Sequence, residues 1–314
     1  MQFERVKAGL TGGTPFVDQV AETGVLTPRE VSRSRVTLAG MRRVIETIGW
    51  GRRPRDRVLI ATYYGLLAGS RVFRGRHGIG VGMFPEFWLG RVAVDTPIGR
   101  FECRGQTTDF DIINPNHEVE LVRRIAHRLS LVSDGNGVFV DVGAHVGKYT
   151  VLAGRLLGTH GQVVAVEPDP SNYAALAANV ALNRLDNVHA LNVGCWSSDG
   201  EMVLNRQVGN LGGHSFIDDT AGDAISVPVR TLDYVLSQVG TTHVDAMKLD
   251  VQRAESEVLM GASSTLEANR RITVFFEESA DSKTARSVRM LRALGFVVER
   301  LDDVNYVAER PDGV

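Results

Sequence analysis

The chain has 314 residues, of which 43% are hydrophobic and 23% charged, the composition of a globular protein with a sizeable core. Two cysteines, Cys103 and Cys195, lie far apart in the sequence, which excludes a disulfide framework and a cysteine-based zinc site. The sequence shows neither an apolar leader nor an apolar stretch long enough to span a bilayer. These features together predict a cytoplasmic protein.

The net charge of −2 hides an asymmetry between the two parts of the chain. Residues 1–110 carry a net charge of +7, and residues 111–314 carry −9. Much of the positive excess is arginine in the segment 42–76. An arginine-rich segment predicts contact with an anionic membrane surface or a phosphorylated carrier, and hence peripheral membrane association. Nucleic acid and a merely solvated helical face are the alternatives.

The basic N-terminal region, residues 1–110, is predicted to be helical first and then to form short strands. Its predicted elements are helices at 41–48 and 57–67 and strands at 91–94 and 99–103. An amphipathic helix follows at 117–131, where apolar residues recur along one side. We place a domain boundary near residue 110, before a second domain of residues 111–314.

Strands and helices alternate beyond residue 131, a pattern typical of a mainly parallel sheet with helices on both faces. Predicted strands cover 138–142, 162–166, 188–193, 244–249 and 272–276. Predicted helices cover 149–157, 171–183, 232–238, 254–260 and 283–294, and Ser171 is expected to cap the second of them. One further hairpin is expected from 202–205 and 225–229, and a closing hairpin from 296–301 and 305–308. The prediction is an α/β fold with a seven-stranded, mainly parallel sheet and an antiparallel C-terminal hairpin.

The sharpest local signal is the stretch VDVGAHVGKYT at 140–150, where an apolar strand runs into a glycine turn and then a helix. Ligands of doubly wound sheets lie beyond the carboxyl ends of the strands, and Gly143 and Gly147 remove side chains where a ligand approaches the backbone. The four-residue spacing, with His145 in the middle, departs from the G-x-G-x-x-G dinucleotide pattern. A zwitterionic amino-acid tail suits this loop better, with Asp141 or nearby carbonyls meeting its ammonium group and backbone amides meeting its carboxylate. His145 is expected to position the loop.

Two polar residues end the next two predicted strands. Glu167 lies twenty residues after Gly147, where a carboxylate can accept hydrogen bonds from both hydroxyls of a ribose. Its alternative role is a surface acid before a turn. Asn192 ends the following strand, where an adenine would lie. Cys195 is expected to pack as a small residue, because no basic partner lies near it in the sequence.

With these pieces in place, the chain resembles the FkbM family of S-adenosylmethionine-dependent methyltransferases. The matching stretches, within 120–308, are VFVDVGAHVGKYT, VVAVEPDPSNYAALAANVALN, NVGCWSSDGEMVL, VPVRTLDYVL, DAMKLDVQRAE and GFVVERLDDVNYVA. The resemblance implies a Rossmann-like class I methyltransferase fold and O-methylation of a sugar, glycan, glycolipid or natural product, with S-adenosylhomocysteine as coproduct. It also implies that Gly143 and Gly147 contact the methionine moiety, Glu167 the ribose and Asn192 the adenine region.

The chain departs from the family pattern in one segment. Family members often read DVEGAE where this chain reads DVQRAE at 250–255. Gln252 cannot act as a carboxylate base or as a strong metal ligand. Arg253 stands where the family pattern has glycine and is expected to change what enters the site.

An alcohol acceptor needs a base within hydrogen-bond reach of its hydroxyl. Asp250 is the first candidate because it follows a strand at the ligand edge, although it can equally bind the cofactor or cap the next helix. Glu277 ends the next strand, and His214 lies in a loop that can close over substrate. These three residues are also types that bind a divalent metal. Residue type alone supports a metal, so none is predicted.

Three functions remain open from the sequence. The first is a methyltransferase for a hydroxyl of a small-molecule or glycan acceptor. The second is an RNA methyltransferase whose arginines follow phosphates, although no RNA-binding module is visible. The third is a non-catalytic scaffold with a cofactor-binding fold, which the Gln252 and Arg253 departures keep open. The intact glycine loop and Glu167 favour an enzyme.

Overall fold

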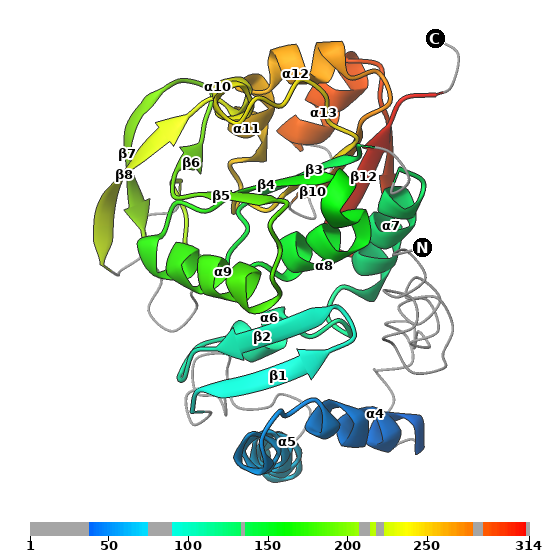
Figure 1. The fold of residues 1–314 in the computed structure, drawn as a ribbon, viewed down its shortest axis with the longest axis vertical. Helices are drawn as coiled ribbons and strands as arrows, with labels where there is room; N and C mark the ends of the chain where they lie inside the picture. The colour runs from blue at the N-terminus through cyan, green and yellow to red at the C-terminus, as the bar shows by residue number, and fades with distance from the viewer. Residues whose placement is uncertain are drawn as a thin grey trace.

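The structure, a computed structural model, describes residues 38–74, 90–132, 136–206, 214–217, 223–278 and 285–311. A seven-stranded sheet of order β11-β12-β10-β9-β3-β4-β5 forms its centre (Figure 1). The strands are β3 (Val138–Val142), β4 (Gln162–Val166), β5 (Val188–Leu191), β9 (Ala246–Leu249), β10 (Thr273–Glu277), β11 (Val297–Arg300) and β12 (Asn305–Glu309). Only β12 opposes its neighbours, pairing antiparallel with β10 and β11, among the described strands of this sheet. The predicted α/β sheet with its antiparallel C-terminal hairpin is confirmed.

The order of the strands places a switch point at the centre of the sheet. The chain starts at β3, moves outward through β4 and β5, and returns to β9 and β10 on the other side of β3. Because these strands are parallel, their carboxyl ends meet at one edge, where ligands of open α/β sheets bind. All five residues of β3 are buried, since helices cover both faces of the sheet.

Helices cover the two faces of the sheet (Figure 1). On one face lie α7 (Val119–Ser130), α8 (Lys148–Leu157) and α9 (Pro170–Leu182), with the short η3 (Gly158–His160) after α8. On the other lie α10 (Leu232–Gln238), α11 (Glu255–Met260), α12 (Ser263–Ala268) and α13 (Arg286–Ala293). Side chains of β3 point alternately to the two faces of the sheet. Phe139 packs in the core beneath α7 and α8, whereas Val140 and Val142 pack in the core beneath α10–α13. Helix α12 was not predicted from the sequence.

The start of α9 corrects one expectation. Asp169, not Ser171, is the N-cap, because its side chain accepts hydrogen bonds from the backbone N–H groups of Ser171 and Asn172. Pro170 is the first helical residue, a position that proline favours because its ring already has a helical φ and no N–H is needed there. The cap therefore falls one residue before the proline, at the end of the β4 loop.

A small second sheet lies beyond β5 (Figure 1). It contains β6 (Gly194–Cys195), β7 (Gly200–Asn205) and β8 (Ala224–Arg230) in the order β6-β8-β7. Strands β7 and β8 pair antiparallel, which confirms the predicted hairpin, and β6 adds to it in parallel.

The N-terminal part adds a layer below α8 and α9 (Figure 1). It contains α4 (Leu38–Gly49), α5 (Pro54–Arg74), the antiparallel hairpin of β1 (Val92–Thr96) and β2 (Gly99–Cys103), and α6 (Asp109–Ile112). The N–H groups of Arg100 and Glu102 on β2 each donate to a side-chain oxygen on or next to α9, those of Asn183 and Asn179, at 2.9 Å. The hairpin is therefore joined to α9 along β2.

Side chains on both sides of residue 110 share one core. Trp50, Ile60 and Phe101 belong to the same buried cluster as Ile125 of α7 and Leu152 of α8. The domain boundary near residue 110 stays a prediction. Residues 1–37 and the last part of the arginine-rich segment 42–76 lie outside the described residues. No helix in the part of the chain that the structure describes is both long and apolar enough to cross a bilayer.

Candidate functional site

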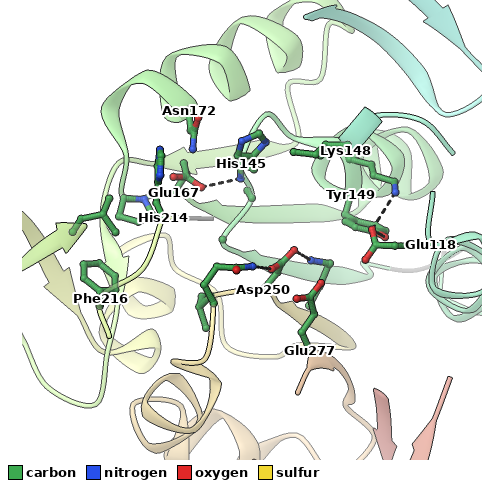
Figure 2. Close-up of a pocket in the computed structure, with 18 of the residues that line it drawn as sticks. Glu118, His145, Lys148, Tyr149, Glu167, Asn172, His214, Phe216, Asp250 and Glu277 are labelled. Atoms are coloured by element: carbon green, nitrogen blue, oxygen red, sulfur yellow. Dashed lines mark hydrogen bonds and ion pairs between the residues drawn. The ribbon is translucent and has the colours of Figure 1, made fainter. Parts of the chain in front are cut away.

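A cavity of about 260 Å³ opens at the carboxyl edge of β3, β4, β9 and β10 (Figure 2). One end is formed by the loop after β3, Glu167 directly after β4, and Leu204 of β7. His214 and Phe216 of the segment 214–217 complete this end. The other end is formed by Lys148 and Tyr149 of α8 with the ends of β9 and β10. The cavity lies where the topology predicts a ligand.

The loop after β3 has room for glycine alone at two positions. Gly143 and Gly147 have φ values of +79° and +90°, in the left-handed region that favours glycine. A β-carbon on Gly143 would overlap the carbonyl oxygen of Asp250, and one on Gly147 would lie 2.7 Å from Leu176 Cδ1. Gly143 lines the cavity, whereas Gly147 lets α9 pack against the loop.

His145 lines the cavity from the middle of this loop. Its φ is +50°, and its backbone N–H donates to Oε2 of Glu167 at 2.8 Å. Burial lowers the pKa of its imidazole to about 4, so the ring is neutral at physiological pH. Neither buried ring nitrogen has a hydrogen-bond partner within the described part of the chain. The ring thus offers a donor and an acceptor to a ligand.

Glu167 directly follows β4 and presents its carboxylate to the cavity. Besides the bond from His145, its Oε1 accepts a hydrogen bond from the N–H of Asp169 at 3.0 Å. Burial raises the pKa of Glu167 to about 7, although the two backbone donors favour its ionised form. The carboxylate is therefore held in place by backbone, at the end of the strand where the ribose was expected.

Like Gly147, two further predicted cofactor residues do not line the cavity. Asp141 is buried in β3, where its Oδ2 accepts a hydrogen bond from Thr150 Oγ1 at 2.6 Å. Asn192 donates through Nδ2 to the backbone carbonyls of Glu167 and Pro168, at 2.8 and 3.0 Å. Asp141 thus connects β3 to α8, and Asn192 connects the ends of β5 and β4. Their ligand contacts stay predictions.

Charged side chains crowd the other end of the cavity. Asp250 accepts a hydrogen bond from Lys248 Nζ at 2.7 Å and another from Gln252 Nε2 at 3.1 Å. Burial alone would lower the pKa of Lys248, but the surrounding carboxylates, Asp250 first, raise it above its usual value. Glu277 faces this pair, and the negative charge of Asp250, together with burial, raises the pKa of Glu277 well above the usual range of a carboxyl group.

Three further residues of this end were not singled out from the sequence. Glu118, at the N-cap of α7, has a left-handed φ of +58°. Its Oε2 accepts hydrogen bonds from Tyr149 Oη at 2.9 Å and Lys148 Nζ at 3.3 Å. The Tyr149 ring lies between two lysines, with Lys148 Nζ 5.0 Å and Lys248 Nζ 4.8 Å from its centre. Lys148 and Tyr149 directly follow Gly147 in the sequence, and this position in the glycine-loop motif could have indicated that they line the site.

The three candidate catalytic residues do not form one group. Asp250 and Glu277 lie together, but His214 lies at the Glu167 end, with Nε2 3.9 Å from Asp169 Oδ2 (Figure 2). The described residues contain no group of three or more His, Cys, Asp or Glu side chains placed to hold a metal ion.

The segment that departs from the family pattern has an unusual backbone. Gln252 and Arg253 have φ values of +50° and +78°. Glu255 Oε1 accepts hydrogen bonds from the N–H groups of Val251 and Arg253, both at 3.3 Å. A glycine at position 253 would adopt this φ without strain, which is a physical reason for the glycine in the family pattern.

Residues 141–298 match the Methyltransferase FkbM domain family, over half of the chain. The chain belongs to the FkbM methyltransferase family. Its topology and this membership confirm the predicted class I methyltransferase fold, and residues 141–298 are its methyltransferase domain.

Individual relatives resemble parts of the chain. Methyltransferase sdnD of Sordaria araneosa is 31% identical over 158 residues, which cover 40% of this chain and 60% of sdnD. The 2-O-methyltransferase NoeI of Sinorhizobium fredii is 27% identical over 223 residues, covering 65% of this chain and 85% of NoeI. A crystal structure of a methyltransferase FkbM from Methylobacillus flagellatus KT is 16% identical, with a TM-score of 0.38, and the match covers 64% of this chain and 53% of that one.

Proposed function

We propose that this chain is an S-adenosylmethionine-dependent O-methyltransferase that acts on a hydroxyl group of a sugar, glycan, glycolipid or natural product. One observation carries the proposal: the fixed carboxylate of Glu167 and the Asp250–Glu277 carboxylate pair face the same cavity from its two ends. The first suits a ribose, and the second suits a hydroxyl that must lose its proton.

The residues at the Glu167 end fit the cofactor. The carboxylate accepts the two ribose hydroxyls, the unpartnered nitrogens of the His145 ring meet polar atoms of the ligand, and Gly143 leaves the backbone open to the methionine part. When bound, S-adenosylmethionine supplies an electrophilic methyl group on a sulfonium, and S-adenosylhomocysteine is the coproduct. Leu204 of β7 and Phe216 of the segment 214–217 offer apolar surface for the adenine ring.

Glu277 is the better base of the two carboxylates. Asp250 is tied to Lys248 and Gln252, so its oxygens are engaged and its charge is compensated. The repulsion between the two carboxylates places the shared proton on Glu277, whose raised pKa makes its ionised form a stronger proton acceptor. The acceptor hydroxyl donates its proton to Glu277, while Asp250 and Lys248 orient the acceptor.

Oxygen as the methylated atom is supported by a relative and by the cavity. NoeI is a 2-O-methyltransferase by name, and the acidic end of the cavity suits a hydroxyl acceptor. The exposed arginines at the start of α5 suit an anionic membrane surface or a phosphorylated carrier that brings the acceptor. They are Arg52, Arg53, Arg55 and Arg57.

Transfer of a labelled methyl group tests the proposal. The protein is incubated with methyl-labelled S-adenosylmethionine and, in turn, monosaccharides, glycolipids, hydroxylated natural products and RNA. We expect the labelled methyl group on a hydroxyl oxygen of an acceptor. Glu277→Gln should abolish this transfer, whereas Glu267→Gln, at an exposed position, should keep it. Label on RNA, or transfer that is unaffected by Glu277→Gln, contradicts it.

A further inference from the structure

A second cavity, of about 560 Å³, lies away from the cofactor site. It opens where the tip of the β1–β2 hairpin meets the C-terminal ends of α8 and α9. Helix α9 has 13 residues and begins beside Glu167, so its two ends are about 20 Å apart. The second cavity is therefore a separate site.

Three arginines from three different elements line this cavity. Arg100 comes from β2, Arg155 from the last turn of α8 and Arg184 from the turn after α9. Asp95 is the one carboxylate among the described lining residues. The lining therefore carries two positive charges in excess.

The carboxylate of Asp95 is shared between one arginine of the cavity and one arginine outside it. Asp95 Oδ1 lies 3.7 Å from Arg100 Nε and 3.3 Å from the Nε of Arg52, which belongs to the arginine-rich N-terminal segment. Arg155 donates from Nη1 to the carbonyl oxygen of Pro97 at 3.1 Å. Burial, and next the positive charge of Arg100, lower the pKa of the Arg155 guanidinium, so the two arginines lie close enough to repel each other.

The walls of the cavity are held rigidly. A β-carbon on Gly99 would overlap the side chain of Val151, so the hairpin tip sits directly against α8. Asn183 accepts a hydrogen bond from the N–H of Arg100 and donates one to its carbonyl oxygen at 2.7 Å. Arg184 has a left-handed φ of +56° at a helix end where glycine or asparagine is usual. An arginine that lines the cavity is therefore held in a backbone conformation that costs free energy.

We propose that this cavity binds a phosphate group. Guanidinium groups from three elements match the several acceptor oxygens of a phosphate, and each can donate two hydrogen bonds. Arg52 and its neighbours extend the positive surface toward α5. The phosphate comes either from a lipid headgroup or from a free phosphorylated molecule.

Titration of the full chain with inorganic pyrophosphate at low salt, by calorimetry, tests this site. The variants are Arg100→Ser and Arg184→Gly, and the matched control is Arg292→Ser at an exposed position of α13. Arg184→Gly removes the guanidinium and relieves the left-handed strain, so it is expected to remain folded, as thermal unfolding will show. We expect binding that weakens at least about tenfold in each site variant, because each loses a charge-assisted hydrogen bond, and that is unchanged in the control.

Vesicles separate the two sources of phosphate. The site is assigned to a lipid headgroup if the protein co-sediments with phosphatidylglycerol vesicles but not with phosphatidylcholine vesicles. Arg184→Gly must abolish this co-sedimentation. Pyrophosphate binding without vesicle binding assigns it to a free phosphorylated molecule. Pyrophosphate affinity that is absent in the natural sequence, or equal in the natural sequence and both site variants, overturns the proposal. None of these readouts depends on methyl transfer.

Discussion

Gly143 lies so close to Asp250 that a β-carbon on the glycine would overlap the backbone carbonyl oxygen of the aspartate. The contact joins the loop after β3 to the end of β9, 107 residues later in the chain. The loop that is proposed to hold the cofactor and the carboxylate pair that is proposed to serve the acceptor are thereby fixed relative to each other. Positioning of this kind is a large part of what a transfer enzyme contributes.

Gly143→Ala tests this contact. The new methyl group meets the Asp250 carbonyl and must adopt a φ of +79°, so we expect a loss of about 3 kcal/mol or more in the free energy of unfolding. Denaturant unfolding measures it. Gly200→Ala is the matched control, since nothing lies within 4 Å of a β-carbon there, and it should change stability by less than about 0.5 kcal/mol. Equal effects of the two substitutions would mean that the contact is looser than described.

Glu167 makes cofactor binding dependent on pH. Its pKa of about 7 means that the carboxylate is partly protonated near neutrality, and ribose hydroxyls bind best to the ionised form. Affinity for S-adenosylmethionine should therefore be highest above pH 7 and fall as the pH drops through 7. Glu167→Gln should weaken binding by about 1–3 kcal/mol and flatten this dependence. Calorimetry at several pH values measures the affinity and its dependence on pH. Glu167→Ala should also weaken binding, and an unchanged affinity in that variant would show that the ribose lies elsewhere.

The Asp250–Glu277 pair predicts a shift in the pH–rate profile. Activity should rise with pH as Glu277 loses its proton, because the ionised form accepts the proton of the hydroxyl. Asp250→Asn removes the repulsion that raises the pKa of Glu277, so the rising limb should move to lower pH. Glu277→Gln should lower kcat by about 10²–10⁴-fold and abolish the limb. A limb that Asp250→Asn leaves in place would remove Glu277 from the role of base.

Arg253→Gly should stabilise the protein. An L-residue at a φ of +78° carries a strain of about 1–2 kcal/mol that glycine avoids. Part of this gain is offset by the greater freedom of glycine in the unfolded chain, so we expect a net gain of about 1 kcal/mol. Thermal unfolding measures the change. Arg292→Gly, within helix α13, is the control and should destabilise by about 1 kcal/mol; destabilisation by Arg253→Gly as well would show that contacts of the Arg253 side chain outweigh the strain.

Much of the fold follows from local patterns in the sequence. The bounds of β3, β4 and α10 match their predictions because a buried apolar run or a capped amphipathic turn marks both ends. Helix α12 is six residues long and directly follows α11, so it has no separate periodic signal. The cap of α9 was misplaced by two residues because serine and aspartate both cap well, and only the place of Pro170 decides between them.

The site shows where local patterns stop being informative. Gly143 and Glu167 line the cavity because they directly follow the neighbouring strands β3 and β4, which the sequence predicts; their contacts with a ligand stay predictions. Glu118 was missed because its partner Tyr149 is 31 residues away, and only the packing of α7 against α8 brings them together. Asn192 was placed at the right strand end, but its side-chain amide is used by the backbone of the β4 loop. Tertiary contacts decide whether a side chain after a strand faces the cavity or bonds to a neighbouring loop.

Calorimetric titration with S-adenosylmethionine and S-adenosylhomocysteine, with NAD as the control, tests the central claim most directly. We expect both sulfur ligands to bind with micromolar affinity and NAD not to bind. The reason is that the loop of Gly143 and His145 is proposed to hold an amino-acid tail, and Glu167 a ribose. Such a result would secure the cofactor and turn attention to the acceptor. Binding of NAD, or of none of the three, would contradict the account of this cavity as the cofactor site of a methyltransferase.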